Sequence, residues 1–577
     1  MAKATAATPA TARSGRSPLA RALWYRQLEH YPDTGPRIFF LAIVVLATIV
    51  LYYELYVAGS VAPAIISQYH MSFRYYVYIS VVANAVGAFS SLVAGLADRW
   101  GRANLVAYGL AITGLLVWFA VPAAPSKLWF ALTLVAVGFV EGIILVATPA
   151  LVRDFSPQVG RGSAMGFWTL GPVIGSLVVS EVSSHTLASH PNWHFQFQVC
   201  GIVGIALFVV ALFGLRELSP QLRDQLMVSM RDRALIEARA AGVDVEESLR
   251  HPWRQMMHAD VIGSAFAISV FLIIYYTAVG FFTIYFTTIF GFSLSQANGI
   301  GNWFWAFDAG ALVVVGLLSD RLRVRKPFMV VGGLGAIAMT VYFLTRTSHL
   351  HTGYYHFVWI VSLLAVFLAI AYAPWMASFT ETVERRNPAL TATGLAVWGW
   401  ILRAVVALSI FVLPLVVASM TPLVDYGTQV SAAAKKYAPE VATASAIDPS
   451  TLAVLSKQPT NGEAALKAVG EVEKALSVPT GQAVQRLLAL ASAAKQPDFR
   501  LLVAHGPEVI KAAHDTPGQW RSWWWVCVGG EAVFLPLIVL MAGRWSPRRA
   551  KEDAAAHQAQ VEAELARLGM GGATGGR

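Results

Sequence analysis

Four ionisable side chains lie near the middle of long apolar runs: Glu54, Glu141, Asp308 and Arg403. An ionisable group inside hydrocarbon is costly unless it faces a cavity or a partner, so each of the four is a candidate functional residue. A guanidinium such as Arg403 suits a carboxylate or phosphate through paired hydrogen bonds. A buried carboxyl such as Glu54 can exchange a proton. Together these residue types favour the binding of an anion and the movement of protons.

Each of these groups also has a structural interpretation. Arg403 can form a permanent ion pair with Asp308 or Glu141, and Glu54 can be the fixed partner of a neighbouring tyrosine. Glu531, which follows two glycines in the last apolar run, has no assigned role. Aromatic and amide side chains of the same runs complete a candidate pocket: Tyr52, Tyr53, Tyr275, Tyr276, Trp303, Trp305 and Asn302.

Membrane-spanning helices are the elements that position these residues. Of 577 residues, 56% are hydrophobic and 13% are charged, whereas a soluble domain has about 25% charged residues. Apolar runs of about 20 residues cross a bilayer, and a helix satisfies its own backbone hydrogen bonds there. Twelve spans are predicted, at 38–64, 75–96, 104–123, 127–152, 162–182, 195–216, 261–289, 296–319, 327–346, 355–382, 390–419 and 522–543.

Lysines and arginines of the short loops set the orientation. They gather on one side, at Arg99 and Arg102, Arg153 and Arg161, Arg321 to Lys326, and Arg385 and Arg386. The positive-inside rule makes that side cytoplasmic, together with both termini. The net charge of +10 therefore reflects topology and does not indicate a nucleic-acid-binding face.

The predicted organisation has seven parts. They are a cytoplasmic tail (1–36), a six-helix bundle (37–216), a cytoplasmic inter-bundle loop (217–258), five helices of a second bundle (259–420), a large extracytoplasmic loop (421–520), helix 12 (521–544) and a cytoplasmic C-terminal tail (545–577). The loop 421–520 is rich in alanine and shows no nucleophile–base or metal pattern, which favours a small helical cap.

The two halves repeat one another in three places. The spacing from Tyr52 to Asp98 is about 46 residues and that from Tyr275 to Asp320 about 45, as internal transporter repeats permit. The matching segments are Leu51-Tyr-Tyr-Glu54 with Ile274-Tyr-Tyr-Thr277, the loops opened by the two aspartates, and Ser163-Ala-Met-Gly166 to Gly171 with Thr391-Ala-Thr-Gly394 to Gly399. The repeat breaks at Glu54 against Thr277 and at Arg403 against Gly175.

The first of these loops resembles the hallmark of the major facilitator superfamily, Gly-x-x-x-Asp-Arg-x-Gly-Arg between spans two and three. Asp98, Arg99, Gly101 and Arg102 fill its last positions, and Gly95 precedes Asp98 by three residues, one fewer than in the hallmark. The second copy contains Gly316, Asp320, Arg321 and Arg323, and it lacks the inner glycine because Leu322 stands directly before Arg323. The resemblance implies an all-α membrane protein with twelve transmembrane helices in two pseudo-symmetric six-helix bundles, working as a monomer.

In the resembled family, spans one, four, eight and eleven line a central cavity, and these spans contain the four charged residues.

The residues of the two motif loops have two interpretations: they form a gate, or they only anchor the topology. For a gate, Arg153 suits Asp98, and Glu381 suits Arg321 or Arg323. Gly171-Pro172-Val-Ile-Gly175 in span five resembles the Gly-Pro motif of the superfamily's antiporters, and a packing kink explains it equally well.

Other functions are disfavoured by what the sequence lacks. It contains no phosphate-binding Gly-x-x-x-x-Gly-Lys-Ser/Thr loop and no His-Glu-x-x-His motif. Cys200 and Cys527 lie inside apolar runs, outside any metal-ligand spacing. No enzyme activity, cofactor or metal is therefore expected. The histidines His185, His190 and His194 fit the rim of a transporter better than a metal site.

These observations predict a secondary active transporter of the plasma membrane that moves a small organic anion together with protons. Its partners are then the solute, protons and the lipid bilayer. A proton-driven exporter of drugs or metabolites is the alternative, supported by the Gly-Pro motif and by aromatic residues paired with acids. A transporter-derived sensor or assembly protein acting through 421–520 is the alternative of another class.

Overall fold

A computed structural model describes residues 23–90, 100–156, 168–223, 256–322, 324–386, 391–458 and 460–549, together with a few single residues beyond 549. The described chain divides into two compact units. Ile66–Tyr75 and Pro414–Trp520 form the insert unit, and the other described residues form the bundle unit. The boundaries between them fall within helices, so α25 contributes residues to both.

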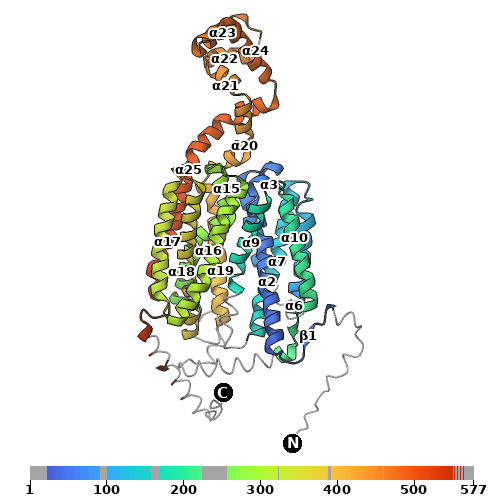
Figure 1. The fold of residues 1–577 in the computed structure, drawn as a ribbon, viewed down its shortest axis with the longest axis vertical. Coiled ribbons are helices and arrows are strands. Elements are labelled where there is room, and N and C mark those ends of the chain that lie inside the picture. The colour runs from blue at the N-terminus through green and yellow to red at the C-terminus, as the bar shows by residue number, and fades with distance from the viewer. Residues whose placement is uncertain are drawn as a thin grey trace. The chain divides into compact units, whose positions relative to one another are not determined.

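The first half of the bundle unit consists of long apolar helices that stand side by side (Figure 1). They are α2 (Thr34–Ser60), α3 (Ala62–Tyr69), α4 (Phe73–Ser90), α6 (Arg102–Leu115) continued by the π-helical η2 (Leu116–Ala120), α7 (Lys127–Phe155), α9 (Gly171–Thr186) and α10 (His194–Gly214). Their core is aliphatic and includes Val44, Leu51, Leu110 and Leu151. Helices suit these sequences because the apolar residues extend around most of the circumference.

The second half repeats this arrangement. Its helices are α14 (Ala259–Phe271), α15 (Ile273–Ile289), α16 (Leu294–Leu322), α17 (Lys326–Arg346), α18 (Tyr354–Arg386), α19 (Thr391–Val416), α25 (Pro497–Leu537) and the short 3-10 helix η5 (Ile538–Leu540). Among the described residues, ten helical segments are long and apolar enough to cross a membrane. The predicted spans two and five coincide with α4 and α9, which the structure describes over 18 and 16 residues. A count of twelve stays a prediction.

The two ends of the bundle unit are named here by one residue each. The Arg102 end contains the turns at Gly101 and Val324, and the Ser184 end contains the turns at Val121 and Gly291. At the Arg102 end, a short parallel pairing joins β1 (Gln27–Leu28) to β2 (Glu217–Leu218).

Arg26, just before β1, is 3% exposed. Its guanidinium donates to the carbonyls of Ala211 (2.8 Å) and Leu212 (2.7 Å) at the end of α10 and to Asn104 Oδ1 (2.8 Å) on α6. A cation is stabilising at a helix C-terminus, where carbonyls lack partners. The chain before α2 is therefore packed from Arg26 onward and is part of the bundle.

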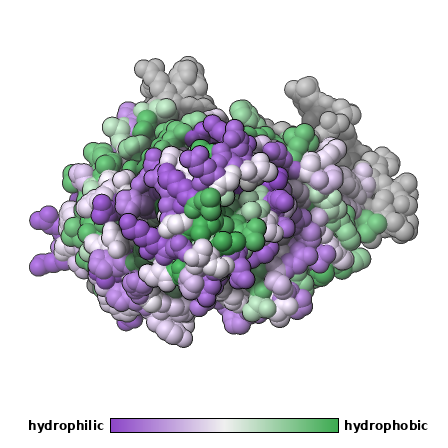
Figure 2. All heavy atoms as spheres, turned by 90° about the horizontal axis from the view of Figure 1, so that it is seen from above, coloured by the Kyte–Doolittle hydropathy of each residue, from purple (hydrophilic) through white to green (hydrophobic). Residues whose placement is uncertain are grey.

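The insert unit is helical, as its alanine content predicts. Its helices are α20 (Met420–Lys436), α21 (Ala438–Ser445), α22 (Pro449–Lys457), α23 (Gly462–Leu476), α24 (Thr480–Ala493) and the first part of α25. A small core contains Tyr437, Ile447, Val472, Leu490 and Phe499. Seen from above, hydrophilic side chains predominate in the middle of the view around a central apolar patch, and apolar side chains are also seen toward the edges (Figure 2).

Within the insert unit, Asp425 of α20 accepts a hydrogen bond from the backbone N–H of Phe73 (3.2 Å) at the start of α4. Burial raises the pKa of Asp425 to about 6, and the neighbouring Glu508 raises it further, while the Phe73 N–H opposes the rise. His505 lies beside this group, 3.5 Å from Glu508 and stacked on Tyr426 at 3.7 Å. The fold therefore favours the protonated form of Asp425.

This shift predicts a pH-dependent stability of the insert unit. Asp425 contributes stability fully below its unfolded pKa of about 3.9, and that contribution is lost as the pH rises through about 6. We expect Asp425→Asn to slow hydrogen exchange in α20 at neutral pH and to leave it unchanged near pH 4. Mass spectrometry at matched pH measures this, with Glu463→Gln on the exposed side of α23 as the control. A difference that is the same at both pH values would contradict the assignment.

Candidate functional site

Tyrosines from both halves meet in the middle of the bundle unit. Tyr52 and Tyr56 lie one turn apart on α2, with ring centroids 5.4 Å apart, and Tyr275 and Tyr276 lie on α15 at 5.3 Å. Tyr372 of α18 is close enough to Tyr52 and Tyr276 to interact with them electrostatically. These five residues are called the tyrosine cluster below.

Charged groups flank the tyrosine cluster from the second half. Arg403 of α19 is exposed and lies within electrostatic range of Tyr52 and Tyr276. Asp308 of α16 is 4% exposed and within range of Tyr275. Trp305 packs edge-on against Tyr275 at 5.1 Å. A cation, an acid and aromatic rings therefore surround one central position.

Two acids of the first half lie behind the cluster. Glu54 and Glu141 are 3% and 1% exposed, and no cation pairs with either among the described residues, although the Thr113 side chain lies beside Glu54. Glu54 lies against Gly204 of α10, inside the first half. Glu141 of α7 is within electrostatic range of Glu54 and of Tyr52. Glu141 thus connects Glu54 to the tyrosine cluster.

The adjacent tyrosine of α2 faces the same interior. Tyr53 is 1% exposed and within electrostatic range of Cys200 on α10. Of the tandem tyrosines, Tyr52 therefore joins the cluster, whereas Tyr53 packs inside the first half. Neither Tyr56 nor Tyr372 was expected from the sequence, although Tyr56 follows Tyr52 by four residues on one helix face.

The glycines of span five allow close packing against Tyr52. A Cβ atom built on Gly175 would lie 2.6 Å from Tyr52 Cβ and 3.0 Å from the carbonyl of Ile49. Gly171 likewise faces Thr48. Pro172 lies in the first turn of α9, where it removes no hydrogen bond that the helix needs. The Gly-Pro segment thus begins α9 and sets its contact with α2.

Among the described residues, four hydrogen bonds join the two halves at the Ser184 end. They run from Thr283 to the carbonyl of Gly59 (2.8 Å), from Asn298 to that of Ser60 (3.0 Å), from Asn302 to Ser184 Oγ (2.7 Å) and from Ser295 to the carbonyl of Ser184. These contacts are called the Ser184 seam. Beneath it lies a cavity of about 30 Å³, lined in part by Tyr56, Ser176, Ser180 and Trp305. Such a volume suits a water molecule and not an organic solute.

Asn302 and Trp303 lie outside the tyrosine cluster. They line an open groove of about 480 Å³ between α9 and α16, together with Glu181 and His185. His185 Nδ1 is 3.4 Å from Glu181 Oε1. Asn302 therefore belongs to the Ser184 seam, not to the central position at which the sequence placed it.

At the Arg102 end of the first half, Arg102 forms an ion pair with Asp154. Its Nη1 lies 2.7 Å from both Asp154 carboxyl oxygens, near the end of α7. Gly101 has a φ of 91°, and a Cβ there would lie 2.5 Å from Glu217 Oε1, which explains the glycine. Gly95, Asp98 and Arg99 lie outside the described residues, so the expected contact of Arg153 with Asp98 stays a prediction.

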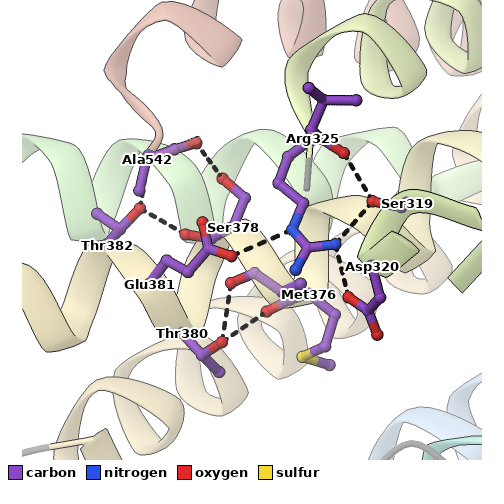
Figure 3. A network of polar contacts seen from close by, with 11 residues as sticks. Ser319, Asp320, Arg325, Met376, Ser378, Thr380, Glu381, Thr382 and Ala542 are labelled. Atoms are coloured by element: carbon purple, nitrogen blue, oxygen red, sulfur yellow. Dashed lines mark hydrogen bonds and ion pairs between the residues drawn. The ribbon is translucent and has the colours of Figure 1, made fainter. Parts of the chain in front are cut away.

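In the second half, the arginine that reaches Glu381 is Arg325. Its Nε donates to Glu381 Oε1 (3.1 Å), and its Nη1 lies 2.7 Å from Asp320 Oδ1 and 2.8 Å from Ser319 Oγ, as Figure 3 shows. Ser378 and Thr382 bind the backbone of Ala542 next to it. Arg321 is exposed, Arg323 lies outside the described residues, and Gly316 has open space around it.

The two ion pairs occupy matching places. Each joins an arginine at the start of the third helix of its half to an acid near the end of the fourth helix: Arg102 with Asp154, and Arg325 with Glu381. Arg325 is therefore the counterpart of Arg102 in space. In the sequence, Arg102 follows Asp98 by four residues whereas Arg325 follows Asp320 by five, so matching the two motif copies does not pair these arginines.

Replacing Arg325 tests this network. We expect Arg325→Gln to lower the free energy of unfolding by about 0.5–1 kcal/mol, since Glu381 and Asp320 are partly exposed and screened. The exposed Arg321 gives a matched control as Arg321→Gln. Thermal unfolding in detergent compares the two variants, and equal transitions would show that Arg325 does not stabilise this end.

Similar proteins show which family this chain belongs to. A model of the Major Facilitator Superfamily matches residues 44–408. A protein named probable anion transporter 3, chloroplastic, from Oryza sativa subsp. japonica is 27% identical over 245 residues, which cover 40% of this chain and 46% of the rice protein. Probable anion transporter 4, chloroplastic, from Arabidopsis thaliana is 25% identical over 247 residues, 41% of this chain and 45% of that protein. The matches thus span about half the length of these relatives.

Among solved structures, the fold is similar to that of a bacterial homologue of the human lysosomal transporter Spinster, in an inward-facing and unoccupied conformation. The TM-score is 0.52 at 17% identity, covering 89% of this chain and all of that one. A family match over most of the chain, supported by this likeness in fold, shows that the protein is a membrane transporter belonging to the major facilitator superfamily.

Proposed function

We propose that this transporter carries a small organic anion together with protons, by alternating access. The observation that carries the proposal is the position of Arg403, which lies within electrostatic range of Tyr52 of the first half and Tyr276 of the second. A guanidinium binds a carboxylate through two parallel hydrogen bonds, and tyrosine hydroxyls can complete the binding. Relatives named as anion transporters support this class of solute.

Glu54 and Glu141 are proposed to carry the protons. Both lie in a buried interior where no cation pairs with either among the described residues, so an uncompensated charge is costly and proton uptake relieves the cost. Their proximity opposes ionisation of both at once. Because Glu141 adjoins the tyrosine cluster, a proton on this pair can respond to an anion at Arg403.

The Ser184 seam is proposed to be the closed outer gate. The positive-inside rule assigns the Arg102 end to the cytoplasm and the Ser184 end to the outside of the plasma membrane, with both termini cytoplasmic. Access from outside then requires the seam to open, while the pairs Arg102–Asp154 and Arg325–Glu381 brace the cytoplasmic ends of the two halves. The same rule makes the loop 421–520 extracytoplasmic.

Proton flux into proteoliposomes tests the proposal. Mono- and dicarboxylates added outside should each be compared with lipophilic cations, while an enclosed dye records the internal pH. We expect carboxylates to acidify the lumen and Glu54→Gln to abolish this acidification. Glu181→Gln, an exposed acid of the outer groove, is the matched control and should behave as wild type. Proton movement driven by cations but by no anion would overturn the proposal in favour of the exporter.

A further inference from the structure

Glu531 is a buried acid that the proposed transport cycle does not use. It lies on α25 with 0% exposure, and its Oε1 accepts a hydrogen bond from Thr340 of α17 (2.7 Å). Its Oε2 has no partner among the described residues. A carboxylate in such a place lacks both water and a counter-charge, so the neutral acid is the more stable form.

The last helices of the two halves match without a gap around this residue. Trp193, Phe197, Cys200 and Gly204 in the first half correspond to Trp520, Trp524, Cys527 and Glu531 in the second. In the first helices, Glu54 corresponds to Thr277. One half therefore has its acid on the first helix and a glycine on the last, whereas the other has a threonine on the first and its acid on the last.

The contacts show that the two acids occupy equivalent compartments, one in each half. A Cβ on Gly204 would overlap Glu54 Oε1, so the glycine leaves the space that the Glu54 side chain fills. In the second half, Glu531 is within electrostatic range of Cys527, which contacts Thr277. A threonine of the third helix adjoins each acid, Thr113 beside Glu54 and Thr340 beside Glu531.

The two compartments differ in their connection to the tyrosine cluster. Glu54 adjoins Glu141, which reaches Tyr52 and Tyr56. Glu531 is bound by Thr340, and α25 is pressed against α14 beside it, because a Cβ on Gly530 would overlap the carbonyl of Val270. Among the described residues, the ionisable group next to Glu531 is the Cys527 thiol, and no second carboxyl group lies beside it.

We propose that each half holds one protonated carboxyl between its first, third and sixth helices, and that only the one in the first half exchanges its proton during transport. Glu531 is the sealed counterpart of Glu54 and keeps its proton throughout the cycle. The part played by Glu54 rests on the proposed function, whereas the state of Glu531 does not.

Infrared spectroscopy of the full chain in proteoliposomes tests this assignment through the absorption of protonated carboxyl groups. We expect Glu531→Gln to remove a component that stays constant with pH and to leave proton-driven transport intact. We expect Glu54→Gln to remove a component that varies with pH and to abolish coupling. Thr340→Val keeps the acid but removes its donor, so it should shift the constant component without removing it.

Two results would overturn the proposal. A Glu531→Gln spectrum identical to that of wild type would mean that Glu531 is ionised, and Thr340→Val would then also leave the spectrum unchanged. Loss of proton coupling in a folded Glu531→Gln protein would mean that its proton is exchanged. If wild type moved no protons with any solute, the proposed function would fail while the infrared test of Glu531 still stood.

Discussion

Oxidation of the double variant Ser180→Cys/Gly301→Cys is expected to stop transport, and reduction to restore it. Ser180 lies on α9 and Gly301 on α16, on opposite sides of the Ser184 seam. A Cβ built on Gly301 is 3.5 Å from Ser180 Cβ, which is within the range of about 3.5–4.5 Å found in disulfides. A covalent bond there holds the halves together at this end, so a cycle that must open the seam is blocked.

The matched controls are the two single-cysteine variants, which should transport in oxidant and reductant alike. Cys200 and Cys527 are buried and can stay in place. Uptake into proteoliposomes measures the effect, and mass spectrometry of peptides confirms the bond. Wild-type turnover by a fully oxidised double variant would show that the seam stays closed throughout transport, contrary to alternating access at this site.

Replacing Arg403 is expected to have the second large effect. Arg403→Gln removes the cation beside Tyr52 and Tyr276, and with it a charged hydrogen bond to the solute worth about 1.5–3 kcal/mol. The apparent affinity for the anion should fall roughly 10- to 100-fold. Arg403→Lys keeps the charge but loses the planar fork, so it should recover only part of that loss.

Concentration-dependent uptake and thermal unfolding together decide the role of Arg403. A binding role predicts a weaker apparent affinity with little change in unfolding temperature. A permanent ion pair with Asp308 or Glu141 predicts the reverse, because breaking it leaves a buried acid uncompensated. Arg321→Gln serves again as the control, since Arg321 is exposed at the end of α16.

Most of the central site could be predicted from the sequence, because a charged side chain is costly in hydrocarbon and therefore indicates a functional position. Arg403, Asp308 and Glu141 were identified by their depth along apolar runs, and all three lie within electrostatic range of tyrosine-cluster residues. The repeat of tandem tyrosines likewise led to Tyr52, Tyr275 and Tyr276. Depth and repetition are properties of the sequence itself, which is why they were accessible without a structure.

The direction in which a side chain points from its helix could not be predicted in the same way. An apolar helix has no polar face to reveal its orientation, so Glu54 and Tyr53 could not be separated from Tyr52 although they point inside the first half. The partner of Glu381 was missed for another reason. Arg325 follows Asp320 by five residues whereas Arg102 follows Asp98 by four, so the motif indicated Arg321 or Arg323 although Arg325 makes the contact.

Because the chain is synthesised from its N-terminus, Arg26 is made long before the residues whose carbonyls it binds. Its acceptor at Ala211 follows 185 residues later, a delay of roughly 10 to 40 seconds at about 5–20 residues per second. The Arg102 end of the first half can therefore complete its packing only after the sixth helix has been synthesised. Since all helices of the second half come later still, the first half can complete its own structure before its partner exists.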